Sequence, residues 1–147
     1  MNANLLAAAA LMVLAGTFLA TQGAVNAALA RNAGGLAAAA ISFGVGFAVL
    51  AGATFLATPL PRPGALANVP WWAWTGGLLG AFFVWATIWS VPRVGVLTVA
   101  AALVLGQMLA ALVIDRLGLF GVPVQPASWA RLAGAALVGC GLVLSRL

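Results

Sequence analysis

The only acidic side chain in this 147-residue sequence is Asp115, which stands beside Arg116 in the segment GQMLAALVIDRLG. The sequence has no histidine, and its single cysteine, Cys140, has no second cysteine in the chain for a disulfide or a metal cluster. Acid–base or nucleophilic catalysis needs pairs of such groups, so we expect no enzyme activity, no metal site and no cofactor. Two roles remain open for the Asp115 and Arg116 charges. They serve ion coupling or gating, or they anchor the structure, with Asp115 either capping a short turn that enters RLGLFG or pairing with an arginine from another loop or a partner chain.

Three amides and one indole interrupt long apolar stretches and are candidates for binding a small solute: Gln22, Asn26, Gln107 and Trp85. Gln22 and Asn26 are four residues apart and share a helix face. Amides in hydrocarbon need partners, either on another helix or on a solute in a wet cavity, and both remain open. Gln107 precedes Asp115 by about 12 Å of helix, which puts Asp115 at the membrane boundary. Trp85 either offers its ring face to an organic cation or packs against lipid or a helix.

The composition identifies an integral membrane protein. The chain is 65% hydrophobic and 5% charged, with a mean hydropathy of +1.20, whereas about a quarter of the residues in an average soluble domain are charged. The six arginines stand singly along the sequence. They form no basic patch, so we expect no nucleic-acid partner.

Five segments are long and apolar enough to cross a bilayer, which takes about 20 residues of helix: about 4–30, 36–57, 71–91, 95–114 and 128–147. The connections between them are short and leave no room for a soluble domain. The sequence therefore predicts one all-α transmembrane domain over residues 1–147, in contact with the lipid bilayer. Gly76, Gly77 and Gly80 open the third span with a GxxxG spacing, which allows another helix to approach closely.

The arginines divide equally between the two sides of the membrane. One side receives the N-terminus and the loops after the second and fourth spans, with Arg62, Arg116 and Arg131. The other side receives the remaining two loops and the C-terminus, with Arg31, Arg93 and Arg146. Because positive charge normally sets orientation, this balance favours insertion both ways and an antiparallel homodimer. Alternatively, the N-terminal amine, the lipid composition or Asp115 selects one orientation.

Several segments in order resemble the YdcZ-like branch of the drug/metabolite transporter superfamily: TQGAVNAAL, AAAAISFGVG, PWWAWTGGLLGAFFV, GQMLAALVIDRLGLFG and SWARLAGAALVGCGLVL. They extend over nearly the whole chain. The resemblance implies a five-helix unit, an antiparallel dimer of ten helices, a place in the bacterial inner membrane, and export or exchange of a small molecule. It names no substrate.

The sequence differs in one respect from more distant members of the same superfamily. Small multidrug exporters of the same superfamily, which have four helices, depend on a glutamate in the middle of their first helix, and residues 4–30 contain no acid. We therefore do not expect proton-coupled export by that mechanism, and the amides favour a neutral, zwitterionic or anionic solute over a cation. The leading hypothesis is a secondary transporter that works by alternating access. The alternatives are a passive pore at an antiparallel dimer interface and a structural subunit that transports nothing.

Overall fold

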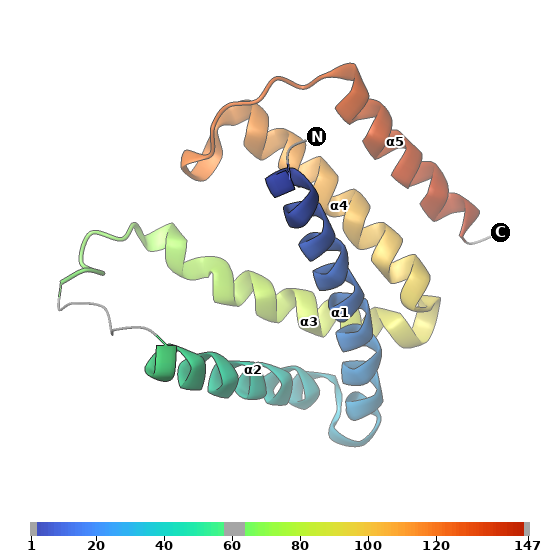
Figure 1. The fold of residues 1–147 in the computed structure, drawn as a ribbon. Coiled ribbons are helices and arrows are strands. Elements are labelled where there is room, and N and C mark those ends of the chain that lie inside the picture. The colour runs from blue at the N-terminus through green and yellow to red at the C-terminus, as the bar shows by residue number, and fades with distance from the viewer. Residues whose placement is uncertain (1–2, 58–63, 146–147) are drawn as a thin grey trace. The chain divides into compact units, whose positions relative to one another are not determined.

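The computed structural model describes residues 3–57 and 64–145, and every regular element in these ranges is helical. Figure 1 shows the elements in chain order: α1 (Ala3–Ala33), α2 (Gly35–Ala57), the short 3₁₀ helix η1 (Trp71–Thr75), α3 (Gly76–Val94), α4 (Val96–Leu117), the 3₁₀ turn η2 (Leu119–Gly121) and α5 (Trp129–Leu144). The prediction of an all-α chain with five long helical segments is confirmed. Arg62 and Arg146, which entered the arginine balance, lie outside the described residues.

Within residues 3–57 and 64–145, four helical segments are long and apolar enough to span a membrane: α1, α2, η1 with α3, and α4. A helix suits this environment because it satisfies its backbone hydrogen bonds internally. The fifth segment is shorter than the predicted span over 128–147, since α5 has 16 residues. At 1.5 Å per residue this is about 24 Å, less than the roughly 30 Å hydrocarbon core.

Glycines in the left-handed conformation end two of the helices. Gly34 has φ 80° and is the single residue between α1 and α2, and its N–H donates to the Ala30 carbonyl at 2.9 Å. Gly118 has φ 61° at the end of α4, and its N–H donates to the Ile114 carbonyl. Residues with a Cβ rarely adopt this conformation, so the two glycines fix where these helices stop.

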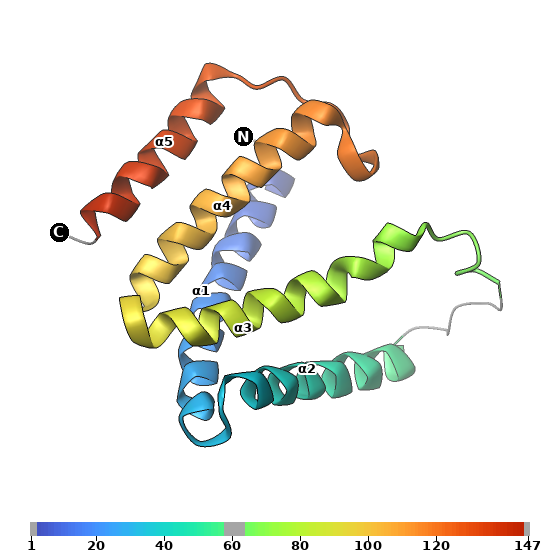
Figure 2. The same ribbon diagram turned by 180° about the vertical axis from the view of Figure 1, so that it is seen from behind.

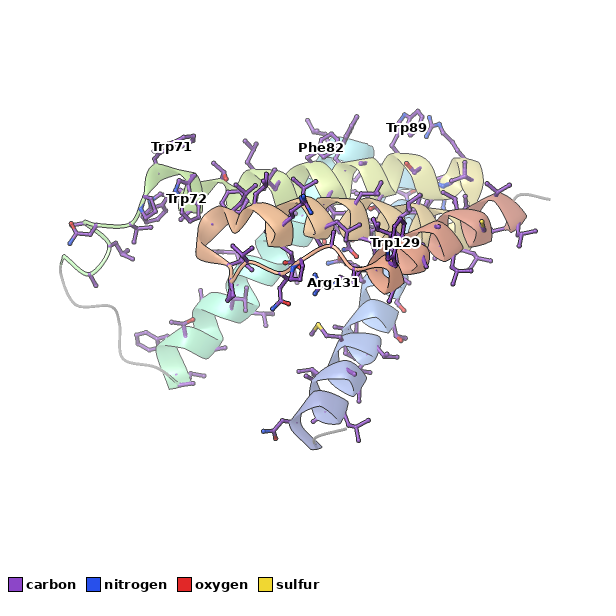
Figure 3. The ribbon with its side chains drawn as sticks, turned by 90° about the horizontal axis from the view of Figure 1, so that it is seen from above. Trp71, Trp72, Phe82, Trp89, Trp129 and Arg131 are labelled. Atoms are coloured by element: carbon purple, nitrogen blue, oxygen red, sulfur yellow. The ribbon has the colours of Figure 1, made fainter. Side chains whose placement is uncertain are left out.

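The chain divides into two compact units, residues 1–93 and 94–147. In the first unit, the start of α2 lies near the C-terminal half of α3, and the two helices diverge from there, as Figure 1, Figure 2 and Figure 3 show. Their contact is a cluster of small and branched side chains, Ala38 and Ala39 with Val84 and Ile88, and residues of α1 pack against it. Close to this cluster α1 also approaches α3. A Cβ built on the buried Gly23 would lie 2.8 Å from the Thr87 methyl.

The second unit is a hairpin of α4 and α5. Small residues of α5 allow the approach, because a Cβ on Gly134 would lie 3.5 Å from the Met108 methyl and Ala135 is buried. Ser128 caps the start of α5, its hydroxyl accepting from the Arg131 backbone N–H at 3.4 Å. A side-chain oxygen at this position satisfies one of the free N–H groups of the first turn.

Most large apolar side chains are exposed, as expected of surfaces that face lipid. Tryptophans lie near both ends of the third segment. Figure 3 shows Trp71 and Trp72 at the start of the third segment and Trp89 toward its other end. Tryptophan is enriched at membrane interfaces, and these positions near the two ends of a membrane-spanning segment agree with that preference.

Candidate functional site

An open cavity of about 440 Å³ lies among α1, α2 and α3 in the first unit, and two of its lining side chains, Phe47 and Leu50, are 74% and 69% exposed. Its walls come from all three helices: Gln22, Ser42, Phe43, Gly46, Phe47, Leu50, Gly80, Phe83 and Val84. Gly46 is near the middle of α2, which runs from residue 35 to residue 57. A helix that crosses the bilayer has its middle near the membrane centre, so the cavity is at the depth where a transported solute would pass.

Two polar side chains face this cavity, and the hydrogen bonds of the described residues include none from either of them. They are the Gln22 amide and the Ser42 hydroxyl. Elsewhere on α1 the hydroxyls are already used, since Thr17 donates to the Val13 carbonyl at 3.1 Å and Thr21 to the Thr17 carbonyl at 2.9 Å. Gln22 and Ser42 are therefore the polar groups that a solute in the cavity would meet.

Asn26 shares the α1 face of Gln22 but has different surroundings. It is buried, with 6% of its surface exposed, and lies among buried small residues of the same helix, Gly23 and Ala27. Gly23 is the point at which α1 meets Thr87 of α3. The structure thus puts Asn26 at a helix contact and Gln22 at the cavity wall.

Trp85 lines a second cavity of about 310 Å³ in the same unit, at the C-terminal end of α3. Trp89 and Arg93 share this cavity, and the Arg93 guanidinium lies 3.9 Å from the centroid of the Trp89 ring. The same guanidinium donates to the Trp89 carbonyl. This ring face already receives a cation from the chain itself, so the cavity offers little room for a cationic solute at Trp89.

Asp115 pairs with Arg131 across the α4–α5 hairpin. Arg131 Nη1 lies 3.0 Å from Asp115 Oδ2, and the two side chains are 40% and 26% exposed, respectively. The Gln125 N–H also donates to the Asp115 carbonyl at 2.8 Å, so the loop folds back onto the end of α4. Arg116, the sequence neighbour, is exposed and takes no part in this pair. Of the two roles considered for Asp115, the ion pair with Arg131 supports structural anchoring.

The remaining candidates lie in open positions. Gln107 is exposed on α4. Of the three glycines of the GxxxG pattern, Gly80 packs against Phe43, whose ring lies 3.2 Å from a Cβ built there. A Cβ on Gly76 or Gly77 would meet no described atom within 4 Å. These two positions leave room for a helix from another chain.

Sequence reasoning missed Ser42 and Arg131 as site residues. Ser42 is the only serine in α2, and a single hydroxyl in an apolar span is a signal of the same kind as Gln22. Arg131 was counted only as a charge that sets orientation, and nothing in the spacing of 16 residues identifies it as the partner of Asp115.

Comparison with known proteins assigns the chain to a family. The model of the family described as "Putative inner membrane exporter, YdcZ" matches residues 7–144. The inner membrane protein YdcZ of Escherichia coli (strain K12) is 40% identical over 83 residues, which are 55% of this chain and 55% of that protein. The match thus spans about half the length of this curated relative. No solved structure matches the chain.

Proposed function

Because the chain belongs to the YdcZ family of inner-membrane exporters and not to an enzyme family, we propose that it is a secondary transporter of a small molecule. In this proposal two copies in opposite orientations form a homodimer, and the dimer works by alternating access. The cavity among α1, α2 and α3 is the part of each copy that receives the solute.

The observation that carries the proposal is this cavity. It lies at mid-helix in three segments, of which α1 and α2 are among those long enough to span the bilayer. Polar groups inside a membrane are costly and mark solute pathways when they face a cavity. Gln22 and Ser42 face one, whereas a protein that only stabilised the bilayer would gain nothing from an amide exposed at that depth.

The inverted dimer is supported by the even division of the arginines. Charges that face opposite sides of the membrane in equal number give no preference to either orientation. Two inverted copies then form a pair in which the inward-open and outward-open states are the same structure seen from opposite sides, which is the symmetry that alternating access uses. A Cβ on Gly76 or Gly77 would meet no described atom within 4 Å, so these positions offer a surface for the second copy.

The orientation of the C-terminus tests the dimer. A cysteine added after Leu147 in a Cys140→Ala background is labelled from each side of intact cells with a reagent that does not cross membranes. We expect comparable labelling from both sides. Labelling from one side alone would exclude dual topology and would require a parallel assembly or an inverted partner protein.

Flux in proteoliposomes tests the transport itself. A secondary transporter exchanges labelled solute inside for unlabelled solute outside, and its rate depends on solute on both sides. A passive pore gives flux that is insensitive to solute on the far side. No flux of any solute across a metabolite panel would identify a structural subunit and would contradict the proposal.

A further inference from the structure

We infer that the cavity among α1, α2 and α3 binds an uncharged aromatic solute that carries one amide-like or hydroxyl group. This inference rests on the proposed function, because it names the class of solute received at the same site. Its basis is the cavity wall, which holds three phenylalanines, two polar groups and no charge among the described residues that line it.

The absence of charge from the wall argues against an ionic solute. The arginine of α1, Arg31, is nine residues from Gln22, and Arg93 of α3 is nine residues from Val84. Each separation is about 13 Å of helix, too far for contact with a solute in the cavity. An ion moved into an apolar cavity without a partner pays a large desolvation cost. The wall therefore selects against the cationic and anionic forms of a molecule and accepts the neutral form.

The aromatic rings of the wall favour a planar solute. Phe43 and Phe47 stand one helical turn apart on α2, and Phe83 faces the cavity from α3. Aromatic rings gain from offset stacking or edge-to-face packing with another ring, beyond the surface that they bury. A Cβ on Gly46 would meet no atom within 4 Å, so this glycine leaves space beside the rings, whereas Gly80 packs against the Phe43 ring. The volume of about 440 Å³ is within the range of small-molecule sites, at its smaller end.

The two polar groups distinguish such a solute from a lipid chain. The Gln22 amide can both donate and accept, and the Ser42 hydroxyl can do the same. An acyl chain in the cavity would leave both groups without a hydrogen-bond partner in an apolar setting, which is unfavourable. A solute with one amide or hydroxyl group satisfies them and keeps its ring against the phenylalanines.

A series of naphthalene probes that differ in one substituent tests the inference. The probes are naphthalene carboxamide (neutral and polar), naphthoate (anion), naphthylmethylammonium (cation) and methylnaphthalene (neutral and apolar). Equilibrium binding of each labelled probe is measured with the full chain in lipid nanodiscs, against empty nanodiscs. We expect the carboxamide to bind at least tenfold more tightly than the other three.

Two matched pairs of variants locate the binding. Gly46→Leu fills the cavity, since a Cβ there meets no atom within 4 Å, and it should weaken carboxamide binding at least tenfold. Gly44→Leu adds the same side chain at an equally open position of α2 outside the cavity, and it should leave carboxamide binding unchanged. If Gly46→Leu does not fold, Gln22→Leu carries the test. Loss of one hydrogen bond should weaken carboxamide binding roughly tenfold but leave methylnaphthalene binding unchanged, with Thr21→Val as the control on the same helix.

The inference is overturned if either ion binds as tightly as the carboxamide, if methylnaphthalene does so, if no probe binds, or if both cavity variants bind as the unaltered chain does. The last result would put the site elsewhere. Failure of the proposed function is a separate result. Carboxamide binding that depends on Gly46, together with no flux in proteoliposomes, would refute transport and keep the site. Flux of another solute without carboxamide binding would support transport and refute the inferred class of solute.

Discussion

Exchanging the two charges of the Asp115–Arg131 pair should make the protein more stable. Asp115 lies in the last turn of α4 and Arg131 is the third residue of α5. Each charge therefore faces the helix end whose partial charge has the same sign. The double substitution Asp115→Arg and Arg131→Asp keeps an ion pair and reverses both interactions with the helix dipoles. It leaves the net charge of this loop unchanged, so the balance of charges across the membrane is not altered.

The exposure of the two side chains limits how much the ion pair and the helix dipoles contribute to the free energy of unfolding. The pair is partly exposed, with Arg131 at 40% and Asp115 at 26%, so solvent limits its coupling energy to about 1 kcal/mol. An unfavourable dipole interaction costs about 0.3–1 kcal/mol per charge. Asp115→Asn or Arg131→Gln alone thus loses the pair but relieves one dipole interaction, for a net loss of at most about 0.7 kcal/mol. The exchanged variant keeps the coupling and gains at both helix ends, by about 1 kcal/mol or more.

Equilibrium unfolding in mixed micelles measures these differences for the two single variants, the exchanged variant and Arg116→Gln. Arg116 is exposed and outside the pair, so its variant controls for the loss of a charge at this end of α4. The reasoning is refuted if the exchanged variant is no more stable than the unaltered chain, or if Arg116→Gln, which removes a cation from the last turn of α4, stabilises the protein.

Two further predictions concern glycines and are checked by the same unfolding measurement. Gly23→Ala should destabilise by about 1–3 kcal/mol, because its Cβ would lie 2.8 Å from the branched side chain of Thr87. Gly16→Ala, on the same helix with no atom within 4 Å, should be neutral or slightly stabilising, and equal losses would contradict the α1–α3 contact. Gly118→Ala should cost more than Gly34→Ala. Both positions have positive φ, which costs about 1–2 kcal/mol with a Cβ, but only at Gly118 would the Cβ also meet a side chain, at 2.8 Å. The opposite order would show that the α4 end adjusts freely.

The helices could be predicted from the sequence because each one is determined by the residues of its own segment. A run of about 20 apolar residues has one stable backbone form in a bilayer, the helix. Glycines such as Gly34 and Gly118 adopt the left-handed conformation that commonly ends a helix. The fifth span was predicted over 128–147, and α5 runs from Trp129 to Leu144. Within the described residues the two differ only at Ser128, which caps the helix, and at Ser145, which follows it.

The residues of the candidate site could be predicted from the sequence only in part. Gln22 was identifiable because an amide in an apolar span is exceptional, but Gln22 and Asn26 were treated as one polar stripe, and the structure separates them. Positions four apart differ by a modest rotation on a helix. That rotation is enough to turn one toward a cavity and the other toward a packed neighbour once α2 and α3 are in place.

The amino-acid sequence by itself determined the class of protein and the number of helical segments, since these depend on composition and on the hydrogen bonding of a single helix. It also sufficed to recognise the family. Tertiary structure decided which polar groups face a common space, and that Asp115 meets Arg131 and not Arg116. The physical reason is that such contacts join residues far apart in the chain. Their distances depend on how small residues such as Gly23 and Ala38 let the helices approach, and no pattern within one helix contains that information.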